Sequence, residues 1–269
     1  MAESTFDRAA FSARLGTRRL GRRLIARGEV SSTNDVAWEA LAEGAPDGAA
    51  VVADVQTAGR GRDGRRWHQS AGQGLALSLL LHPGCERRQL ATLPLIAGLA
   101  LARALERLGA SAELKWPNDL LLSGRKVSGI LAESRGAPQG GDAVVVGAGV
   151  NVLQSPEDFP PELAPLATSL AMEGCATTRE AVAAEFLNEL EPLWTLMQEG
   201  GREQVLEAWR ARAGIWGREV RAQTPAGPRV GIARELDADG GLVIEQADGQ
   251  RVTIVAGDVE PAGPPGARA

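Results

Sequence analysis

The chain has 269 residues, of which 44% are hydrophobic and 23% charged, a composition typical of a globular protein with room for one large and one small domain. Its formal net charge of -5 and pI near 5.3 argue against general affinity for nucleic acid or anionic membranes. Cys85 and Cys175 lack metal-binding spacing, and we expect them to be reduced thiols. No secretory signal is seen, so we expect a cytoplasmic protein. The longest apolar runs are too short to span a bilayer, so we expect no membrane partner.

Strands and helices are predicted in alternation over the first hundred or so residues. The Ser31–Asp35 segment supplies side chains that cap a helix, and the apolar face that follows ends at Gly44. A near-continuous apolar run is typical of a strand that is buried on both faces. On these grounds we expect strands over residues 20–30, 49–55 and 74–81, and helices over residues 36–44 and 94–108.

The middle of the chain predicts a strand-rich segment followed by helices. Ser123-Gly124 is typical of a tight turn between two strands. Thr177 and Glu180 have the spacing of a helix capping box, and the helix that they begin contains Pro192, where we expect a kink or break. The expected strands cover residues 112–116, 120–122, 127–132 and 143–152, and a later helix covers residues 203–213.

The composition changes after Gly214, where short alternating strands replace helices. Pro/Gly and Asp-Gly turns separate expected strands over residues 218–223, 228–236, 241–246 and 251–255. Short strands at this spacing predict a small SH3-like β-barrel. We therefore divide the chain into a first domain over residues 1–213, a barrel over 214–262 and a disordered tail over 263–269.

One stretch, from Gln56 to Trp67, concentrates cationic side chains in a protein that is acidic overall. Four arginines and three glycines fall within eight of its residues. Glycine lets successive backbone N–H groups form a concavity for an anion, and arginine presents planar forks that match phosphate oxygens. The stretch therefore predicts a loop, called the Gly/Arg loop below, that orders around a polyphosphate or a carboxylate–phosphate intermediate. The alternative is a solvated basic loop.

Polar residues at the ends of the predicted strands and helices suggest the rest of a site. Ser32-Thr33-Asn34 stands at a helix start, where it either holds a urea-like or carbonyl group or serves only as a cap. Lys115 to Asp119 ends a strand and either serves a phosphate, a base and a magnesium ion or forms an ordinary turn. Asn151 follows glycines at a strand end, where it could read an adenine edge.

Lys126 enters an apolar strand, and an unpaired buried ammonium is costly. If it faces a cleft it can bind a substrate carboxylate and an α-phosphate together, whereas at a sheet edge it would only discourage aggregation. The chain has no GxxxxGK[ST] phosphate loop, and the GRGRDG segment lacks the strand-to-helix context of a dinucleotide-binding fold.

The order and spacing of these stretches resemble the biotin protein ligase family. The matching text is SSTND, QTAGRGRDGRRW, KWPNDLLL, GRKVSGILAE and VGAGVN, followed by the small C-terminal barrel. The resemblance covers about residues 20–260, and its motifs are specific as a set although each alone is weak. It implies an α+β fold, in which a mixed β-sheet packs with helices and an SH3-like barrel follows.

The resemblance also implies a reaction and the residues that carry it. Family members make biotinyl-5′-adenylate from biotin and ATP with Mg²⁺, release pyrophosphate, and pass the biotin to one lysine of a biotin carboxyl carrier domain. By similarity, Lys126 and Arg62 are catalytic. The biotin and adenylate contacts are Ser32, Thr33, Asn34, Gln56, Gly59, Arg60, Gly61, Arg62, Lys126 and Gly129. Residues assigned to the ATP side are Arg65, Trp67, Lys115, Asn118 and Asn151, with Asp119 as a magnesium ligand.

The chain departs from part of this family. Members that also act as repressors carry an N-terminal helix-turn-helix domain, whereas only about thirty residues precede Ser32, so we expect a ligase that does not bind DNA. The sequence leaves open whether the chain forms a homodimer.

Two other functions compete with this reading: a lipoate ligase or octanoyltransferase of the same fold, and a non-enzymatic regulator that binds biotin or nucleic acid. The Gly/Arg loop and the barrel disfavour the first, and the net acidity disfavours the second.

Overall fold

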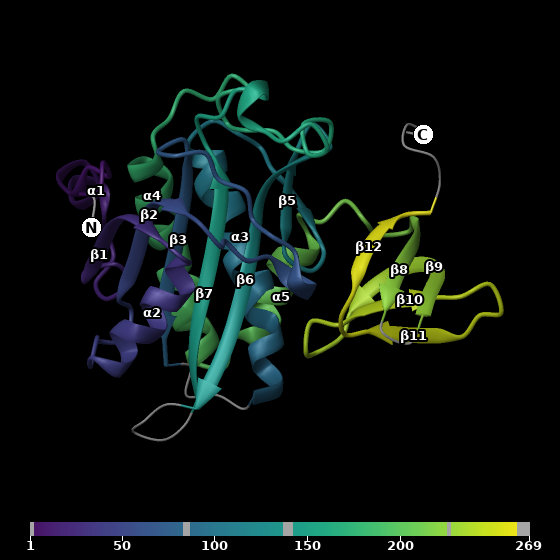
Figure 1. Cartoon of the computed structure of the whole chain (residues 1–269). Coiled ribbons are helices and arrows are strands. Elements are labelled where there is room, and N and C mark those ends of the chain that lie inside the picture. Colours follow the sequence, from purple (N-terminus) through teal and green to yellow (C-terminus); the bar gives the residue numbers. More distant parts are fainter. Residues whose placement is uncertain (1–2, 83–86, 137–141, 225–226, 263–269) are drawn as a thin grey trace.

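The computed structural model describes residues 3–82, 87–136, 142–224 and 227–262 and contains two β-sheets (Figure 1). The helices are α1 (Arg8–Arg14), α2 (Thr33–Ala42), α3 (Leu93–Arg107), α4 (Arg179–Gln198) and α5 (Arg202–Arg210), and short 3₁₀ turns cover Arg62–Gly64, Arg87–Thr92 and Pro156–Asp158. The strands of the first sheet are β1 (Leu24–Val30), β2 (Ala50–Gln56), β3 (Gly74–Leu81), β4 (Glu113–Lys115), β5 (Asp119–Leu122), β6 (Arg125–Gly136) and β7 (Asp142–Asn151). Those of the second are β8 (Glu219–Thr224), β9 (Gly227–Leu236), β10 (Leu242–Glu245), β11 (Arg251–Ile254) and β12 (Asp258–Pro261).

The first sheet is mixed, as the sequence predicts. Its strand order is β1-β2-β3-β7-β6-β5-β4. β1 and β2 are parallel and are connected through α2, whereas every other neighbouring pair is antiparallel. The order places β3, β7 and β6 side by side in the centre, although β3 and β6 are distant in sequence. This arrangement brings the segments that carry the predicted motifs to one region of the sheet.

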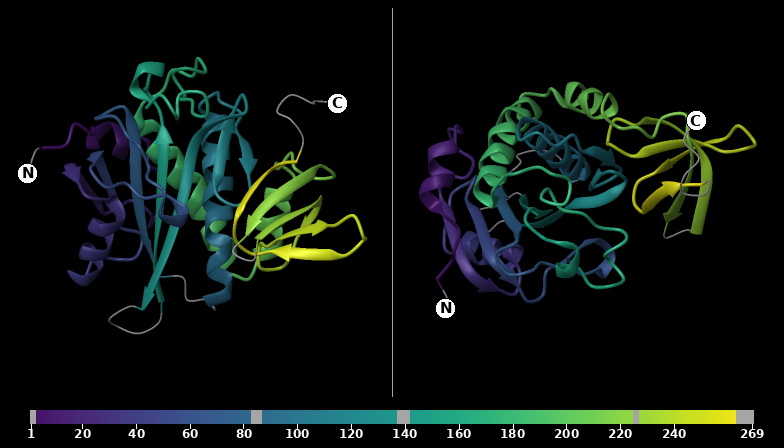
Figure 2. Two further views of the ribbon diagram at one scale, coloured as in Figure 1. Left: turned by 45° about the vertical axis from the view of Figure 1, so that its right-hand side comes forward. Right: turned by 90° about the horizontal axis from the view of Figure 1, so that it is seen from above.

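Helices cover both faces of this sheet, because its central strands are apolar on both sides. Leu77 and Leu79 of β3 belong to the large core that includes α3 and α4, while Leu80 belongs to a smaller core with Trp38 and Leu41 of α2. Figure 2 shows α3 and α4 together behind the sheet, with α2 on the opposite side. No helix within the described residues has the length and apolar character needed to cross a membrane.

The helix starts and stops follow capping chemistry, with two differences from expectation. Ser32 caps α2 by accepting a hydrogen bond from the Asn34 N–H. The cap of α4 is Thr178, not Thr177, and its hydroxyl accepts from the Ala181 N–H. The expected break at Pro192 is also wrong, since α4 continues as one helix through that residue. Buried apolar side chains on both flanks of the proline hold the two halves of α4 against the core.

The N-terminal segment is fastened to the first sheet through a buried ion pair. Arg179 Nη1 lies 2.7 Å from Asp54 Oδ1, and both side chains are less than 10% exposed. The Thr5 N–H donates to the other Asp54 oxygen at 2.6 Å. Burial by itself would raise the pKa of Asp54, but the Thr5 N–H and the Arg179 guanidinium together lower it below its ordinary value.

Replacing Asp54 by alanine should lower the free energy of unfolding at neutral pH by about 3 kcal/mol, because Arg179 is left as a buried, unpaired charge. Urea denaturation measures this change, and the exposed Glu39→Ala exchange is a control expected to alter stability by less than about 0.5 kcal/mol. A carboxyl group with a lowered folded-state pKa stabilises the fold above its unfolded pKa, and that stability is lost as pH falls through the folded value. The difference between parent and variant should therefore shrink below about pH 4. An equal difference at every pH would contradict this role.

The second sheet is antiparallel with the order β11-β10-β9-β8-β12. The predicted C-terminal all-strand unit is confirmed, and β12, which the sequence pattern did not indicate, extends it. Within the described residues no ladder joins β11 to β12, so the sheet does not form the closed barrel that we expected. The predicted tail over residues 263–269 lies outside the described residues, as does Cys85, whereas Cys175 is a buried free thiol as expected.

The second sheet packs beside α5 and the end of β4 (Figures 1 and 2). The Trp116 indole N–H donates to the Gly240 carbonyl at 3.0 Å, and Arg202 pairs with Asp239 at 2.9 Å. Side chains of both sheets belong to one continuous hydrophobic core. The KWPND segment is therefore also a contact between the two parts of the chain.

Candidate active site

Glycines flatten one face of the central strands and make the floor of the candidate site. Gly149 of β7 lies opposite Gly129 of β6, and Gly147 occupies the same face two residues earlier. A Cβ atom on Gly147 would lie 2.5 Å from Asn34 Oδ1, and one on Gly149 would lie 2.4 Å from Trp67 Cε2. These glycines are required because side chains from α2 and the Gly/Arg loop approach the backbone there.

One end of this floor is a buried, uncharged polar cluster at the start of α2. Gln56 Oε1 accepts from the Thr33 N–H at 2.8 Å and from the Thr33 hydroxyl at 3.1 Å. The Ser78 hydroxyl lies 2.7 Å from Thr33 Oγ1 and 2.6 Å from Asn34 Oδ1. The structure thus brings Thr33 and Asn34 of the helix-start motif together with Gln56 from the Gly/Arg stretch. Such groups recognise a neutral ligand that both donates and accepts hydrogen bonds.

Ser78 was not predicted as a site residue. It is fully buried in β3 and pairs in register with Gly147, so it faces α2. The available signal was a lone polar residue in the otherwise apolar run of residues 74–81. A buried hydroxyl needs a partner, which makes such a residue a marker of a polar site.

Arg60 extends from the Gly/Arg loop between two carboxylates that the sequence analysis did not single out. Its guanidinium donates a hydrogen bond to Asp35 Oδ2 at 2.9 Å, forms an ion pair with Asp35 Oδ1 at 2.8 Å, and lies 3.3 Å from Glu133. Hydrogen bonding to Arg60 lowers the pKa of Asp35, although partial burial opposes this, and the two carboxylates raise the pKa of Arg60. Glu133 also accepts from the Asn34 amide and the Trp38 indole. Arg60 is therefore fixed as a cation next to the neutral polar cluster.

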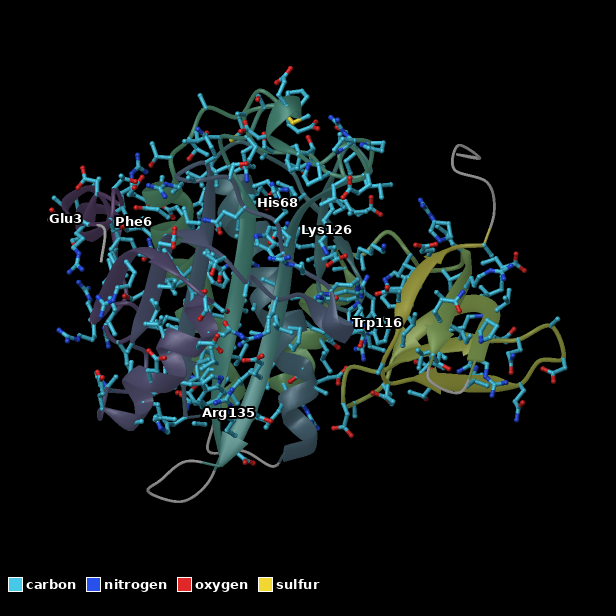
Figure 3. The ribbon with its side chains drawn as sticks, viewed as in Figure 1. Glu3, Phe6, His68, Trp116, Lys126 and Arg135 are labelled. Carbon is cyan, nitrogen blue, oxygen red and sulfur yellow. The ribbon has the colours of Figure 1, made fainter. Side chains whose placement is uncertain are left out.

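Lys126 of β6 extends over the glycine floor, where its Nζ would lie 3.2 Å from a Cβ atom on Gly129; Figure 3 labels Lys126 in the fold. Its Nζ lies 2.6 Å from Asp119 Oδ1 and 5.9 Å from the centre of the Trp67 ring. Its backbone pairs with the segment around Ala167: the Lys126 N–H donates to the Leu166 carbonyl, and the Lys126 carbonyl accepts from the Thr168 N–H. This double attachment fixes the position from which the ammonium extends, and β6 lies between β7 and β5, so Lys126 is not on an edge strand of the sheet.

Two further arginines of the loop, Arg62 and Arg65, lie at the far end of the site. Arg62 donates to Asn118 Oδ1 at 3.2 Å, and Arg65 pairs with Asp258 at 2.7 Å. A cavity of about 390 Å³ lies under the loop and is lined by residues 58–66 with Leu131 and Glu133. A ligand with a neutral polar end and an anionic end matches this gradient from amide and hydroxyl groups to cations.

Some predicted residues are engaged in structural contacts. The Asn151 amide donates to the Thr168 carbonyl and accepts from Gln154, so the structure uses its polar groups to hold a loop. Ser32 is buried as the cap of α2. In the described part of the chain no three His, Cys, Asp or Glu side chains gather as a metal-binding cluster, and Asp119 pairs with Lys126 instead.

Comparison with known proteins identifies the family. Residues 28–151 match the Biotin/lipoate A/B protein ligase family, and residues 215–260 match the Biotin protein ligase C terminal domain. The chain is 37% identical to the biotin--[acetyl-CoA-carboxylase] ligase of Mycobacterium tuberculosis over 239 residues, which cover 86% of each protein. It belongs to the biotin protein ligase family. The corresponding enzyme of Paracoccus denitrificans is 39% identical over 84% of this chain and 95% of its own length, and the bifunctional ligase/repressor BirA of Bacillus subtilis is 36% identical over 91% of this chain and 76% of its own.

Solved structures of this family have the same fold. The Aquifex aeolicus biotin protein ligase in complex with biotin and ATP superposes with a TM-score of 0.73 at 30% identity, covering 90% of this chain and all of that one. The Leishmania major ligase in complex with biotinyl-5-AMP superposes with a TM-score of 0.59 at 27% identity over 87% of this chain and 99% of its own. The predicted family and α+β fold are confirmed, and the chain is a ligase. The C-terminal domain match and the relatives' names favour a biotin ligase over a lipoate ligase.

Proposed function

We propose that this chain joins biotin to a biotin carboxyl carrier domain at the expense of ATP, through biotinyl-5′-adenylate. The proposal rests on how charge changes along the site, from uncharged polar groups at one end to cations at the other, in a chain that belongs to this family. The polar cluster of buried Thr33, Asn34 and Ser78 with half-buried Gln56 suits the uncharged urea group of biotin. The cations at the other end suit its carboxylate and the phosphates of ATP.

In the first step, a carboxylate oxygen of biotin attacks the α-phosphorus of ATP, and the bond to the β-phosphate breaks with release of pyrophosphate. Two anions must approach each other, so fixed cations lower the barrier by offsetting their repulsion. We assign this role to Lys126 and Arg62, with Arg60 orienting the biotin chain. Lys126 lies over the floor at Gly129, where the carboxylate and the α-phosphate can both reach its ammonium. Asp119 holds that ammonium until the substrates replace it as partner.

In the second step, the carrier lysine amine attacks the carbonyl carbon of the mixed anhydride. An amide bond forms, the bond to the phosphate oxygen breaks, and AMP leaves. The anhydride must be protected from water until the carrier arrives, which requires a cover over the site. The Gly/Arg loop is in position for this, because Trp67 packs on Gly149 and the residues before it line the cavity.

We propose that Mg²⁺ enters with ATP. Magnesium in nucleotide sites is usually held by one or two carboxylates, phosphate oxygens and water. Asp119 is the candidate carboxylate. When bound, the ion would neutralise charge on the leaving pyrophosphate.

The decisive experiment offers the purified chain ATP, labelled pyrophosphate and either biotin, lipoate or octanoate. We expect label to exchange into ATP with biotin only, and to stop when a chelator removes the metal. Labelled biotin should then pass to a purified carrier domain in the presence of ATP. Exchange with lipoate or octanoate but not biotin would select the rival ligase. A steeply salt-dependent gel shift with DNA and no exchange would select the regulator.

Trp67→Ala, which removes the indole, should raise the KM for ATP by about tenfold, because stacking of a base on an aromatic ring is worth about 1–3 kcal/mol. Gly149→Ala should have a similar effect without touching the tryptophan, since its Cβ would displace the ring. Gly136→Ala on the neighbouring strand is the control, because no atom lies within 4 Å of its Cβ position. Initial rates at varied ATP measure all three. An unchanged KM in the first two variants would remove Trp67 from the nucleotide site.

The remaining assignments are proposals of the same kind. Residues 1–213 would form the catalytic domain and residues 214–262 the second domain. The family resemblance implies the carrier domain as the acceptor, and the cysteine usage predicts a cytoplasmic setting. Sedimentation analysis with and without biotin and ATP would establish the oligomeric state.

A further inference from the structure

Two arginines of the Gly/Arg loop are held by the second domain. Arg65 pairs with Asp258 through both ends of its guanidinium. Nη2 donates a hydrogen bond to Oδ1 at 3.0 Å, and Nη1 forms an ion pair with Oδ2 at 2.7 Å. Arg62 donates to the Gly257 carbonyl at 2.7 Å and lies 3.8 Å from the Asp258 carboxylate. The carboxylate and carbonyl are nearly two hundred residues away from the loop in sequence, so only the packing of the two domains brings them together.

The position of Asp258 is fixed by its own domain. Asp258 is the first residue of β12 and pairs with Gln223 of β8. Gly257 has a φ of 137°, and a Cβ atom on it would lie 2.0 Å from the Gln223 carbonyl oxygen. No other residue type fits at 257 without moving the strand, so the chain turns there in a way that glycine alone allows. The carboxylate is thus presented from a strand end, not from a free loop.

The second domain is in turn anchored to the first at the segment that ends in the nucleotide site. Trp116 holds the Gly240 carbonyl, and its neighbour Lys115 lies near enough to Asp258 to lower its pKa. Burial by itself would raise the pKa of Asp258, but the Arg65 hydrogen bond and the charges of Arg65, Arg62 and Lys115 lower it below its ordinary value. Asp258 is therefore charged at neutral pH, when it holds the two arginines.

We propose that Asp258 is a positioning residue that the second domain contributes to the first: its contact with Arg65 and Arg62 keeps the Gly/Arg loop closed over the activated biotin. This inference rests on the proposed function. On this view the second domain helps to retain the activated biotin, in addition to packing against the first domain. A positioning residue of this kind changes how fast the intermediate escapes more than how fast it forms.

A different role for the same contact gives opposite expectations. If Asp258 only neutralises cations until the ATP phosphates displace it, its removal should lower the KM for ATP and leave retention unchanged. If it holds the loop, its removal should leave formation of the adenylate within about twofold and speed its release. The pair is partly exposed, so we expect release to increase by about threefold to tenfold and not by orders of magnitude.

The first experiment needs no substrate. Limited trypsin digestion of the nucleotide-free chain, resolved by mass spectrometry, gives the rate of cleavage after Arg60, Arg62, Arg65 and Arg66. Asp258→Asn should accelerate cleavage at these sites, Asp258→Glu should restore part of the protection, and Glu260→Gln should match the parent. Glu260 is the control because it lies on the same strand with an exposed side chain. Equal cleavage in parent and Asp258→Asn would overturn the proposal.

The second experiment measures escape of the intermediate. The chain is loaded with biotin and ATP, and labelling of a lysine-rich bystander protein without a carrier fold is followed. A bystander is necessary because Lys115 and Lys126 are the only lysines in the sequence, so self-labelling of the chain is a poor reporter. Asp258→Asn should label the bystander about threefold to tenfold faster than the parent or Glu260→Gln. A lower KM for ATP with parent-like labelling would instead support the counter-ion role.

The same assay separates this inference from the proposed function. If the parent shows no biotin-dependent pyrophosphate exchange, the proposed function fails whatever the digestion shows. If the parent exchanges pyrophosphate and Asp258→Asn neither opens the loop to trypsin nor releases the intermediate faster, the function stands and the role of Asp258 fails. Thermal unfolding of each variant accompanies the assay, and a positioning role predicts faster release at an unchanged unfolding temperature.

Discussion

Lys126→Ala should reduce biotin-dependent pyrophosphate exchange by about a hundredfold to a thousandfold, the largest loss that we expect from a single exchange. The ammonium is the cation closest to the glycine floor where carboxylate and phosphate would meet, and removing one preorganised group that stabilises developing charge costs about this much. Because the fold around it depends on backbone pairing with Leu166 and Thr168, the variant should fold normally.

Two companion variants make the Lys126 result specific. Lys126→Met keeps the length of the side chain and should be as inactive as Lys126→Ala, because the charge is what matters. Arg125→Ala removes the neighbouring cation, which pairs with Glu173, and should keep exchange within about twofold of the parent. Exchange near the parent rate in Lys126→Met would show that the charge at this position is dispensable.

The fold could be predicted where it depends on local chemistry. The apolar run of β3 coincides with the predicted residues 74–81, and Ser32 caps α2 as its side chain and position suggest. The prediction failed where distant packing decides. Pro192 does not end α4, because buried side chains on both flanks hold the helix, and β12 has only Val259 as an apolar signal and forms through pairing with β8.

The candidate site was predicted in pieces, and the structure supplies the partners. Thr33 belongs to the helix-start motif, whereas Gln56 and Arg60 belong to the Gly/Arg stretch, and the pairing of β1 with β2 brings these two motifs together. Glu133 was missed, although it follows Gly129 and Leu131 at intervals of two along β6 and should therefore face the same side. Asp258 gave no local signal, since its importance arises only from the contact between domains.

The arginines of the Gly/Arg loop would repel one another if they had no acidic partners. In the structure Arg60 faces Asp35 and Glu133, and Arg65 faces Asp258, so carboxylates elsewhere in the chain neutralise this repulsion. A closed loop without ligand is therefore electrostatically balanced, and substrate phosphates have to compete with these carboxylates.

Arg62→Gly should release the activated biotin about tenfold to a hundredfold faster than the parent. Arg62 is the link between three elements, since it extends from the loop to Asn118 and to the Gly257 carbonyl. Losing two hydrogen bonds from a charged donor removes more than the exposed contact of Asp258 alone, and glycine also frees the backbone. Labelling of a lysine-rich bystander, compared with labelling of the carrier domain, measures the release.

The Arg62 and Asp258 predictions also constrain each other. If both residues act by holding the loop closed, Asp258→Asn should add little to Arg62→Gly, because part of the contact that it removes is already lost. Independent roles would instead make the two effects on the release rate multiply. Arg66→Ala is a control within the loop, since its guanidinium donates only to the Thr57 carbonyl of the loop itself, and it should release biotin at close to the parent rate. If Arg62→Gly labelled the carrier domain alone, the loop would not be what retains the intermediate.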